Sequence, residues 1–197
     1  MFSPSCLLPS ARRCSTLREG QSRISTRAFV EEARRIKELM APFQVPLIIN
    51  DRLDVALAVG ADGVHVGQDD MPYEIARKLM GPKAIVGLSV ETWEDVERAE
   101  KLDADYLGVS PVFATPTKTD TKEPWGLEGL ARIRAFSHHH LVAIGGLNAS
   151  NAEAVVMAGA DGVAVVSAIC ASPDPLATSR ELTDIINIAL LKRRGSR

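Results

Sequence analysis

The stretch VPLIINDRLDVALAVGADGVHVGQDD, residues 45–70, contains the pattern on which the fold prediction depends. Val45–Ile49 is a short continuous apolar run, which is typical of a strand buried on both faces of a parallel sheet. Leu53–Val59 has the composition of a helix, and Gly60 is suited to end it. Gly63–Val66 is a second apolar run, so the stretch predicts a strand, a helix and another strand.

The same alternation continues along most of the chain. The expected helices cover residues 27–42, 53–59, 73–80, 92–102, 127–136, 151–158 and 175–192, and the expected strands cover 45–49, 63–66, 84–88, 106–109, 141–144 and 162–166. An Ala-Asp pair, beginning at residues 61, 104 and 160, opens three of these strands. Strands alternating with helices indicate a parallel sheet. Units of about 20 residues, with no sign of a switch in strand order, favour a TIM-type (β/α)8 barrel over a doubly wound sheet.

The strand count falls short of that barrel. Six strands are clear, and Ser15–Arg18 is a candidate for a seventh, whereas the complete barrel has eight. We therefore expect a barrel that lacks its first βα unit or has an altered one. The predicted division of the chain is an atypical N-terminal segment, residues 1–20, and a single barrel domain, residues 21–197.

Composition excludes several classes of function. A formal net charge of −2 and a pI near 6.1 give no electrostatic basis for binding nucleic acid or an anionic membrane, and no apolar run is long enough to cross a bilayer. Cys6, Cys14 and Cys170 lack metal-ligand or redox spacing and read as reduced thiols, which favours a cytoplasmic protein. Residues 1–26 are rich in Ser and Arg, with Glu19 as their only acid. An organellar transit peptide and an altered start without targeting meaning are both open readings of that segment.

In a βα barrel, functional side chains lie on the loops that follow the carboxyl ends of the strands. Asn50 and Asp51 hold such positions, and so does one of Asp69 and Asp70 on the next strand. Two carboxylates and an amide oxygen suit Mg²⁺, which completes its shell with phosphate oxygens and water. The alternative is that Asp51 only caps the helix that follows it.

Other strand ends point to phosphate groups. Gly145-Gly146 allows backbone N–H groups to approach an anion, although a glycine pair also serves to make a turn, and Ser167 follows the adjacent strand. The loop SPVFATPTKTDTKEPWG, residues 110–126, is unusually long, and its Lys118, Thr115 and Thr117 can bind phosphate oxygens. A lid role for this loop is a reasonable hypothesis. His65 lies within an expected strand and is interpreted as a core or lining histidine.

These motifs, taken in order, resemble those of the thiamine-phosphate synthase family. The resemblance rests on IINDRLDVALAVGADGVHVGQDD, GLSV, SPVFATPTKTD, AIGGL and GADGVAVVSAI, and it runs from about residue 14 to residue 192. It implies a transferase that couples a pyrimidine diphosphate to a thiazole phosphate and releases pyrophosphate. The implied mechanism is dissociative and Mg²⁺-assisted, with charge stabilisation in place of a catalytic nucleophile.

The resemblance also implies roles for individual residues and a set of partners. Asp51 and Asp70 are implied as Mg²⁺ ligands, and the implied partners are the two small-molecule substrates, with a homo-oligomer as an open alternative to a monomer. The residues implied to hold the diphosphate are Arg18, Asn50, Ser89 and Lys118. The residues implied for the thiazole phosphate pocket are Thr115, Pro116, Thr117, Gly146, Val166 and Ser167.

The N-terminus departs from the family pattern, which leaves alternatives open. Where the family has a Gln-x-Arg-x-Lys strand, this chain has Thr16, Arg18 and Gly20, so the glutamine and the lysine are replaced. A thiazole tautomerase-like isomerase is one alternative, but that paralogue has a histidine near Pro111 and does not need the metal pair. A catalytically impaired, phosphate-binding remnant is the other alternative, because the first βα unit is incomplete.

Overall fold

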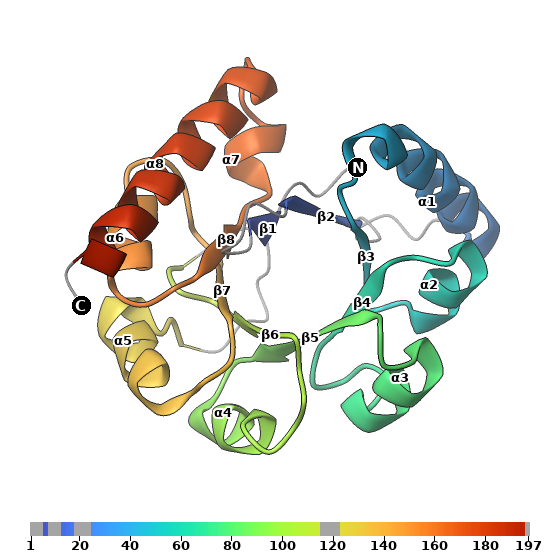
Figure 1. Cartoon of the computed structure of the whole chain (residues 1–197), viewed down its shortest axis with the longest axis horizontal. Coiled ribbons are helices and arrows are strands. Elements are labelled where there is room, and N and C mark those ends of the chain that lie inside the picture. The colour runs from blue at the N-terminus through green and yellow to red at the C-terminus, as the bar shows by residue number, and fades with distance from the viewer. Residues whose placement is uncertain (1–5, 8–12, 18–24, 115–122, 196–197) are drawn as a thin grey trace.

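The computed structural model describes residues 6–7, 13–17, 25–114 and 123–195, and its strands form a closed barrel surrounded by helices (Figure 1). The strands are β1 (Cys6–Leu7), β2 (Arg13–Leu17), β3 (Leu47–Asn50), β4 (Gly63–Val66), β5 (Ile85–Val90), β6 (Tyr106–Val109), β7 (Leu141–Ile144) and β8 (Gly162–Ala164). The helices are α1 (Thr26–Met40), the 3-10 turn η1 (Ala41–Phe43), α2 (Leu53–Val59), α3 (Tyr73–Met80), α4 (Trp93–Ala99), α5 (Gly126–Phe136), α6 (Ala152–Met157), α7 (Ser167–Cys170) and α8 (Pro175–Gly195). The predicted TIM-type barrel is confirmed.

The first unit of the barrel is altered, as predicted. Strands β2 to β8 pair in parallel in chain order, whereas β1 pairs antiparallel with both β2 and β8 and so closes the ring. Only residues 8–12 separate β1 from β2, and a parallel crossover takes roughly a dozen residues or more. The two strands can therefore pair only in the antiparallel sense. β1 brings the number of strands to eight, above the six or seven that the sequence predicts.

Among the described residues, no helix lies directly beside the two N-terminal strands. In Figure 1, the ring of described helices is interrupted next to β1 and β2, between α1 and α7. The predicted boundary between residues 20 and 21 lies outside the described residues. The division into a segment 1–20 and a domain 21–197 therefore stays a prediction, although strands of the first segment pair with the barrel.

Local sequence signals set the ends of several helices. Ser25 caps α1, because its hydroxyl accepts a hydrogen bond from Ala28 N at 3.2 Å. Thr92 and Asp95 form a capping box at the start of α4. Gly60 ends α2 in the left-handed region, at φ +60°, where a residue without Cβ is favoured. Within residues 25–114 and 123–195, no helix combines the length and the apolar character that a membrane span requires.

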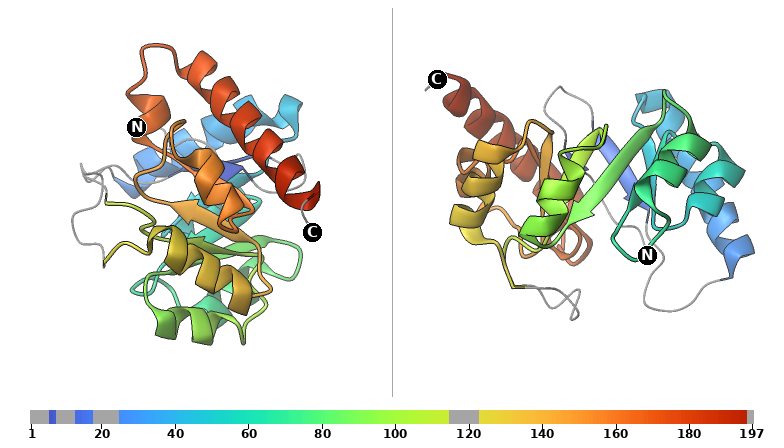
Figure 2. Two further views of the ribbon diagram at one scale, coloured as in Figure 1. Left: turned by 90° about the vertical axis from the view of Figure 1, so that its left-hand side faces the viewer. Right: turned by 90° about the horizontal axis from the view of Figure 1, so that it is seen from below.

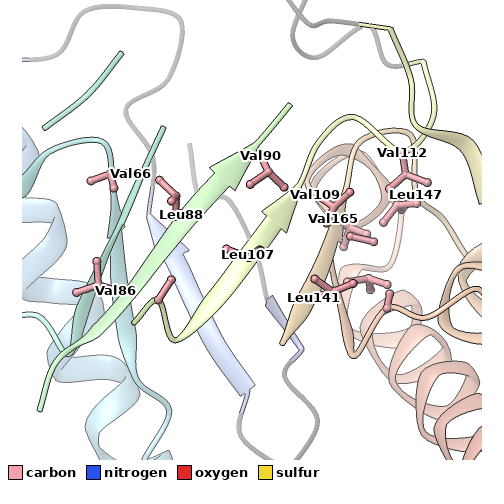
Figure 3. Close-up of a cluster of buried hydrophobic side chains, with 14 of the residues drawn as sticks. Val66, Val86, Leu88, Val90, Leu107, Val109, Val112, Leu141, Leu147 and Val165 are labelled. Carbon is pink, nitrogen blue, oxygen red and sulfur yellow. The ribbon is translucent and has the colours of Figure 1, made fainter. Parts of the chain in front are cut away.

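The strands are buried on both sides, and alternate residues serve two separate apolar clusters. The larger cluster lies between the sheet and the helices, and Figure 3 shows side chains of β4 to β8 that belong to it, among them Val66, Leu88 and Leu107. The smaller cluster contains Ile48 and Val142 and occupies the barrel interior. The continuous apolar runs in the sequence follow from this double burial.

The repeated Ala-Asp pairs have a structural role at the amino-terminal ends of the strands. In each repeat, the aspartate bonds twice to a residue near the start of the preceding strand: its backbone N–H donates to that residue's carbonyl, and its carboxylate accepts from that residue's N–H. The pairs are Asp62–Leu47, Asp105–Val86 and Asp161–Leu141. These contacts satisfy backbone groups at the amino-terminal face of the barrel. Residues at that face are expected to contribute to stability and not to catalysis.

Asp161 also joins the outer helices to the barrel. It accepts a hydrogen bond from Arg134 Nη1 of α5 at 3.0 Å and from Arg193 Nη2 of α8 at 2.7 Å. All three side chains are less than a fifth exposed, at 14%, 19% and 15% for Asp161, Arg134 and Arg193. α8 runs alongside α6 in Figure 2. Because Asp161 binds both α5 and α8, its carboxylate helps to hold the C-terminal helices against the barrel.

We expect Asp161→Ala to lower the free energy of unfolding by about 3–5 kcal/mol, because it leaves two largely buried guanidinium groups without their anion. Urea denaturation measures the change. Glu153→Ala, which removes one partner of the exposed ion pair with Lys192, is the control and costs no more than about 1 kcal/mol. Equal small losses in both variants would contradict this role of Asp161.

Candidate active site at the carboxyl ends of the strands

Asn50, Asp51, Asp70 and Ser89 lie at the carboxyl ends of three neighbouring strands. Asn50 is the last residue of β3 and is paired in register with His65 of β4. Asp51 follows directly, and its N–H donates to the carbonyl of His65 at 2.8 Å. Ser89 is inside β5, one residue before its end, and not in the loop after it. The pairing of β3, β4 and β5 therefore brings these residues to one edge of the barrel.

The backbone of Asp51 is unusual. Its φ is +66°, in the left-handed region, where Asp and Asn are the non-glycine residues most often tolerated. The N-cap position of α2 is held by Arg52 and not by Asp51. The metal-ligand and helix-cap interpretations of Asp51 therefore both stay predictions.

Of the two alternatives Asp69 and Asp70, Asp70 lies against the end of β4. Its Oδ2 accepts a hydrogen bond from Gly67 N at 2.7 Å, and its charge acts on the buried ring of His65. The side chain of Asp69 is exposed. The hydrogen bond with Gly67 orients the Asp70 carboxylate and leaves its second oxygen available for another partner.

The chemistry of these donors fits Mg²⁺. Asp51 and Asp70 supply carboxylate oxygens and Asn50 an amide oxygen, which are hard ligands, and Mg²⁺ is usually held by one or two carboxylates together with substrate phosphates and water. Among the described residues, no group of three or more His, Cys, Asp or Glu side chains is placed to hold a metal ion. A site that depends on two carboxylates and on substrate oxygens is consistent with that finding, and these ligands stay a prediction.

Gly145 and Gly146 have a packing reason for being glycine. Their φ values are +98° and +67°, and a Cβ on either would lie 2.8 Å from a side-chain carbon, of Pro111 and Phe113 respectively. The segment after β6 thus crosses directly over the end of β7, where Phe113 N–H donates to the Gly145 carbonyl at 3.2 Å. The predicted approach of an anion to Gly146 is not tested by this packing.

The remaining predicted phosphate ligands divide into two groups. Val166 directly precedes α7 and Ser167 is the first residue of that helix, after β8 and so beside the end of β7. Near the end of β7, Asn151 Nδ2 donates to the Gly146 carbonyl at 3.0 Å, and this bond holds the turn formed by residues 146–151. The other predicted ligands lie outside the described residues, and their roles stay predictions: Arg18, Thr115, Pro116, Thr117 and Lys118.

A buried histidine contacts the candidate site, and the sequence assigned it no function beyond lining the core. His65 Nε2 lies 2.8 Å from Ser89 Oγ, and His65 Nδ1 lies 3.0 Å from the hydroxyl of Tyr106. The imidazole is only 6% exposed. Burial lowers the pKa of His65 to about 4, while the charge of Asp70 acts in the opposite direction, so the ring is neutral near pH 7.

Two glycines provide the space for this contact. His65, Gly87 and Tyr106 are paired in register on β4, β5 and β6, so the two rings meet across the middle strand. A Cβ on Gly87 would lie 2.2 Å from Tyr106 Cζ and 2.6 Å from His65 Nδ1, and one on Gly108 would lie 2.9 Å from His65 Cε1. A glycine at the matching position between two inward polar residues is the sequence signal that could have identified the group.

Ser89 is also held through its backbone. Gln68 Nε2 donates to the Ser89 carbonyl at 2.6 Å, and Arg98 Nη2 of α4 donates to Gln68 Oε1 at 3.1 Å. Arg98 in turn pairs with Asp95, which forms the capping box of α4 with Thr92. Sequence reasoning did not assign a role to Gln68, although it lies in the loop after β4 with Asp70.

We expect Gly87→Ala to lower the free energy of unfolding by about 1–3 kcal/mol, because the added methyl group overlaps the ring of Tyr106 in a filled interior. Chemical denaturation measures this. Gly195→Ala is the matched control, since a Cβ there meets nothing within 4 Å, and it leaves stability unchanged or slightly raised. Unchanged stability of Gly87→Ala would show that the interior is not filled at this point.

Comparison with known proteins identifies the family of the chain. The family model of thiamine monophosphate synthase matches residues 7–169. The thiamine-phosphate synthase of Albidiferax ferrireducens is 56% identical over 174 residues, which are 88% of this chain and 78% of the relative. The thiamine-phosphate synthase of Chloroflexus aurantiacus is 51% identical over 164 residues, 83% of this chain and 76% of the relative.

Solved structures with a similar fold include a member of the same family. A thiamine phosphate pyrophosphorylase from Pyrococcus furiosus has a TM-score of 0.79 and 38% identity, over 89% of this chain and 84% of that protein. An orotidine 5′-phosphate decarboxylase from Pyrococcus horikoshii, at a TM-score of 0.60 and 20% identity over 81% of each chain, shares the fold alone. The extent of the family match and the identity to its members together show that the chain belongs to the thiamine monophosphate synthase family.

Proposed function

We propose that this protein is a transferase of thiamine biosynthesis, which couples 4-amino-2-methyl-5-pyrimidinylmethyl diphosphate to a thiazole phosphate and releases pyrophosphate. The observation that carries the proposal is the 56% identity, over 88% of the chain, to a thiamine-phosphate synthase. The position of Asn50, Asp51, Asp70 and Ser89 on adjacent strand ends supports it. A cytoplasmic location, favoured by the spacing of the three cysteines, and a homo-oligomer are part of the proposal.

The proposed reaction exchanges one bond for another at the pyrimidine methylene carbon. The C–O bond to the diphosphate breaks, and its electron pair leaves with the pyrophosphate. The thiazole nitrogen then donates its lone pair to the methylene carbon, and a C–N bond forms. Negative charge accumulates on the leaving group, so donors and cations placed there stabilise the transition state more than the ground state.

Asp51 and Asp70, with Asn50, are the residues that would hold Mg²⁺. When bound, the ion neutralises charge on the diphosphate oxygens. The two carboxylates need no further base or nucleophile beside them for this role. The hydrogen bond from Gly67 N holds Asp70 in place, and the backbone of Asp51 is fixed to β4 through the carbonyl of His65.

The remaining residues bind and orient the substrates. Asn50 and Ser89 lie at the carboxyl ends of β3 and β5. We propose that they donate hydrogen bonds to the diphosphate, together with Arg18 and Lys118. Gly146, Val166 and Ser167 lie at the ends of β7 and β8 and are proposed to bind the thiazole phosphate, with Thr115 to Thr117. The described members of the two groups lie at different strand ends of one barrel: Asn50 and Ser89 are in β3 and β5, whereas Gly146, Val166 and Ser167 follow β7 and β8. This separation suits a reaction that brings two phosphorylated substrates together.

We expect Asp51→Asn to lower kcat/KM for pyrophosphate release by at least about 100-fold, because a charged ligand of the leaving-group cation becomes neutral. Asparagine tolerates the left-handed φ of this position, so the variant preserves the backbone. The assay supplies the pyrimidine diphosphate, thiazole phosphate and Mg²⁺ and follows pyrophosphate. Removal of Mg²⁺ with a chelator abolishes turnover in the parent chain.

Asp54→Asn is the control, because the Asp54 side chain is 60% exposed in the first turn of α2 and pairs with Arg52. It leaves turnover within about twofold of the parent chain. Absence of turnover in the parent chain, with thiazole phosphate still bound, would favour a phosphate-binding remnant. Metal-independent interconversion of the thiazole tautomer would favour the isomerase alternative.

A further inference from the structure

The hydrogen bonds around His65 restrict which way the hydroxyl proton of Ser89 can point. The ring is buried between two hydroxyl groups, and burial favours its neutral form, which carries one proton, on Nδ1 or on Nε2. With the proton on Nδ1, the ring donates to Tyr106 and the Ser89 hydroxyl must donate to Nε2. With the proton on Nε2, the ring donates to Ser89 Oγ and Tyr106 donates to Nδ1.

Only the second arrangement suits an anionic ligand. A diphosphate oxygen accepts hydrogen bonds and donates none, so a serine that faces it must donate its single proton outward. That proton is free only when His65 Nε2–H donates to Ser89 Oγ. The tautomer with the proton on Nε2 is also the more stable form of a neutral histidine side chain in water.

We propose that Tyr106 and His65 are positioning residues that fix the hydroxyl of Ser89 as a hydrogen-bond donor toward an anionic group of the substrate. The inference rests on the proposed function, in which Ser89 faces the diphosphate. Tyr106 supplies the proton that holds His65 in the required tautomer, and His65 passes this orientation to Ser89. Neither ring needs to touch the substrate.

The packing of the group supports a fixed geometry. The rings of His65 and Tyr106 stack with centroids 5.4 Å apart and planes at 23°, and Tyr106 is 3% exposed. Gly87 and Gly108 enclose them so closely that neither position has space for a Cβ. Gln68 holds the Ser89 carbonyl from the rim, so the serine is fixed through both its backbone and its side chain.

Among the described residues, the charged group that acts on His65 does not supply the proton instead. Asp70 is the charge that acts on the ring from the loop after β4, and a carboxylate there accepts but does not donate. The groups within hydrogen-bond distance of the ring nitrogens are the hydroxyls of Tyr106 and Ser89. The choice of tautomer therefore depends on which hydroxyl donates to the ring.

A double-mutant cycle tests the proposal. Tyr106→Phe removes the hydroxyl and keeps the ring, and we expect kcat/KM for the pyrimidine diphosphate to fall about tenfold, the cost of weakening one hydrogen bond to a charged group. KM for the thiazole phosphate stays unchanged. In a Ser89→Ala background, the same substitution changes kcat/KM by less than about twofold, because Tyr106 acts through Ser89.

Tyr73→Phe is the matched control. Tyr73 is also buried, and its hydroxyl donates to Asp103 Oδ1 at 3.0 Å, in the connection that precedes β6 at the amino-terminal end of that strand, so its removal leaves kcat/KM unchanged. An equal loss from Tyr106→Phe in both backgrounds would overturn the proposal, since it would show a structural effect independent of Ser89. No loss in the parent background would overturn it as well.

Two further measurements keep the outcomes separate. If the parent chain shows no turnover, the proposed function fails, and the cycle is then measured on the affinity for inorganic pyrophosphate with Mg²⁺ by calorimetry, where the same non-additivity is expected. If Tyr106→Phe does not fold, His65→Gln and His65→Leu replace it. The glutamine amide can donate to Ser89 and retains about tenfold more activity than leucine; equal losses overturn the proposal.

Discussion

The contact between His65 and Tyr106 across Gly87 is the constraint on which the candidate site depends. It requires a strand, β5, with no side chain at the point where two inward residues of its neighbours meet. The same strand carries Ser89 two residues later, on the same face of the sheet. A substitution that fills the space at Gly87 therefore displaces both the core rings and the serine. Core packing and substrate binding are joined in one layer of the barrel.

Much of the fold could be predicted from the sequence, because its signals are local. α2, α3, β4, β6 and β7 have the predicted bounds, since each strand is a short apolar run and each of these helices ends directly before a glycine. β1 could not be predicted in this way. It has only two residues, and its antiparallel pairing with β8 depends on Ala164, far away in the sequence. α7 was missed because its four residues follow β8 without a helical repeat of apolar positions.

The candidate site was predictable to the extent that it follows the topology. The rule that strand ends carry function placed Asn50 and Asp51 beside one of Asp69 and Asp70, and the family resemblance implied Asp70. It could not show that Arg52 takes the cap of α2, or that Gly145 packs against Pro111. It also assigned His65 to the lining of the core. That placement is correct, but the function of a histidine depends on which groups its two nitrogens meet, and these come from β5 and β6.

Nitrogen-15 NMR of the histidine-labelled chain tests the central claim most directly, with His65 assigned by comparison with His65→Gln. The account predicts a proton on Nε2 and none on Nδ1, both in the free chain and with inorganic pyrophosphate and Mg²⁺ bound. In Tyr106→Phe, the preference between the two nitrogens weakens. A proton on Nδ1 of His65 with pyrophosphate bound would contradict the account, because Ser89 would then donate to the ring and not to the ligand.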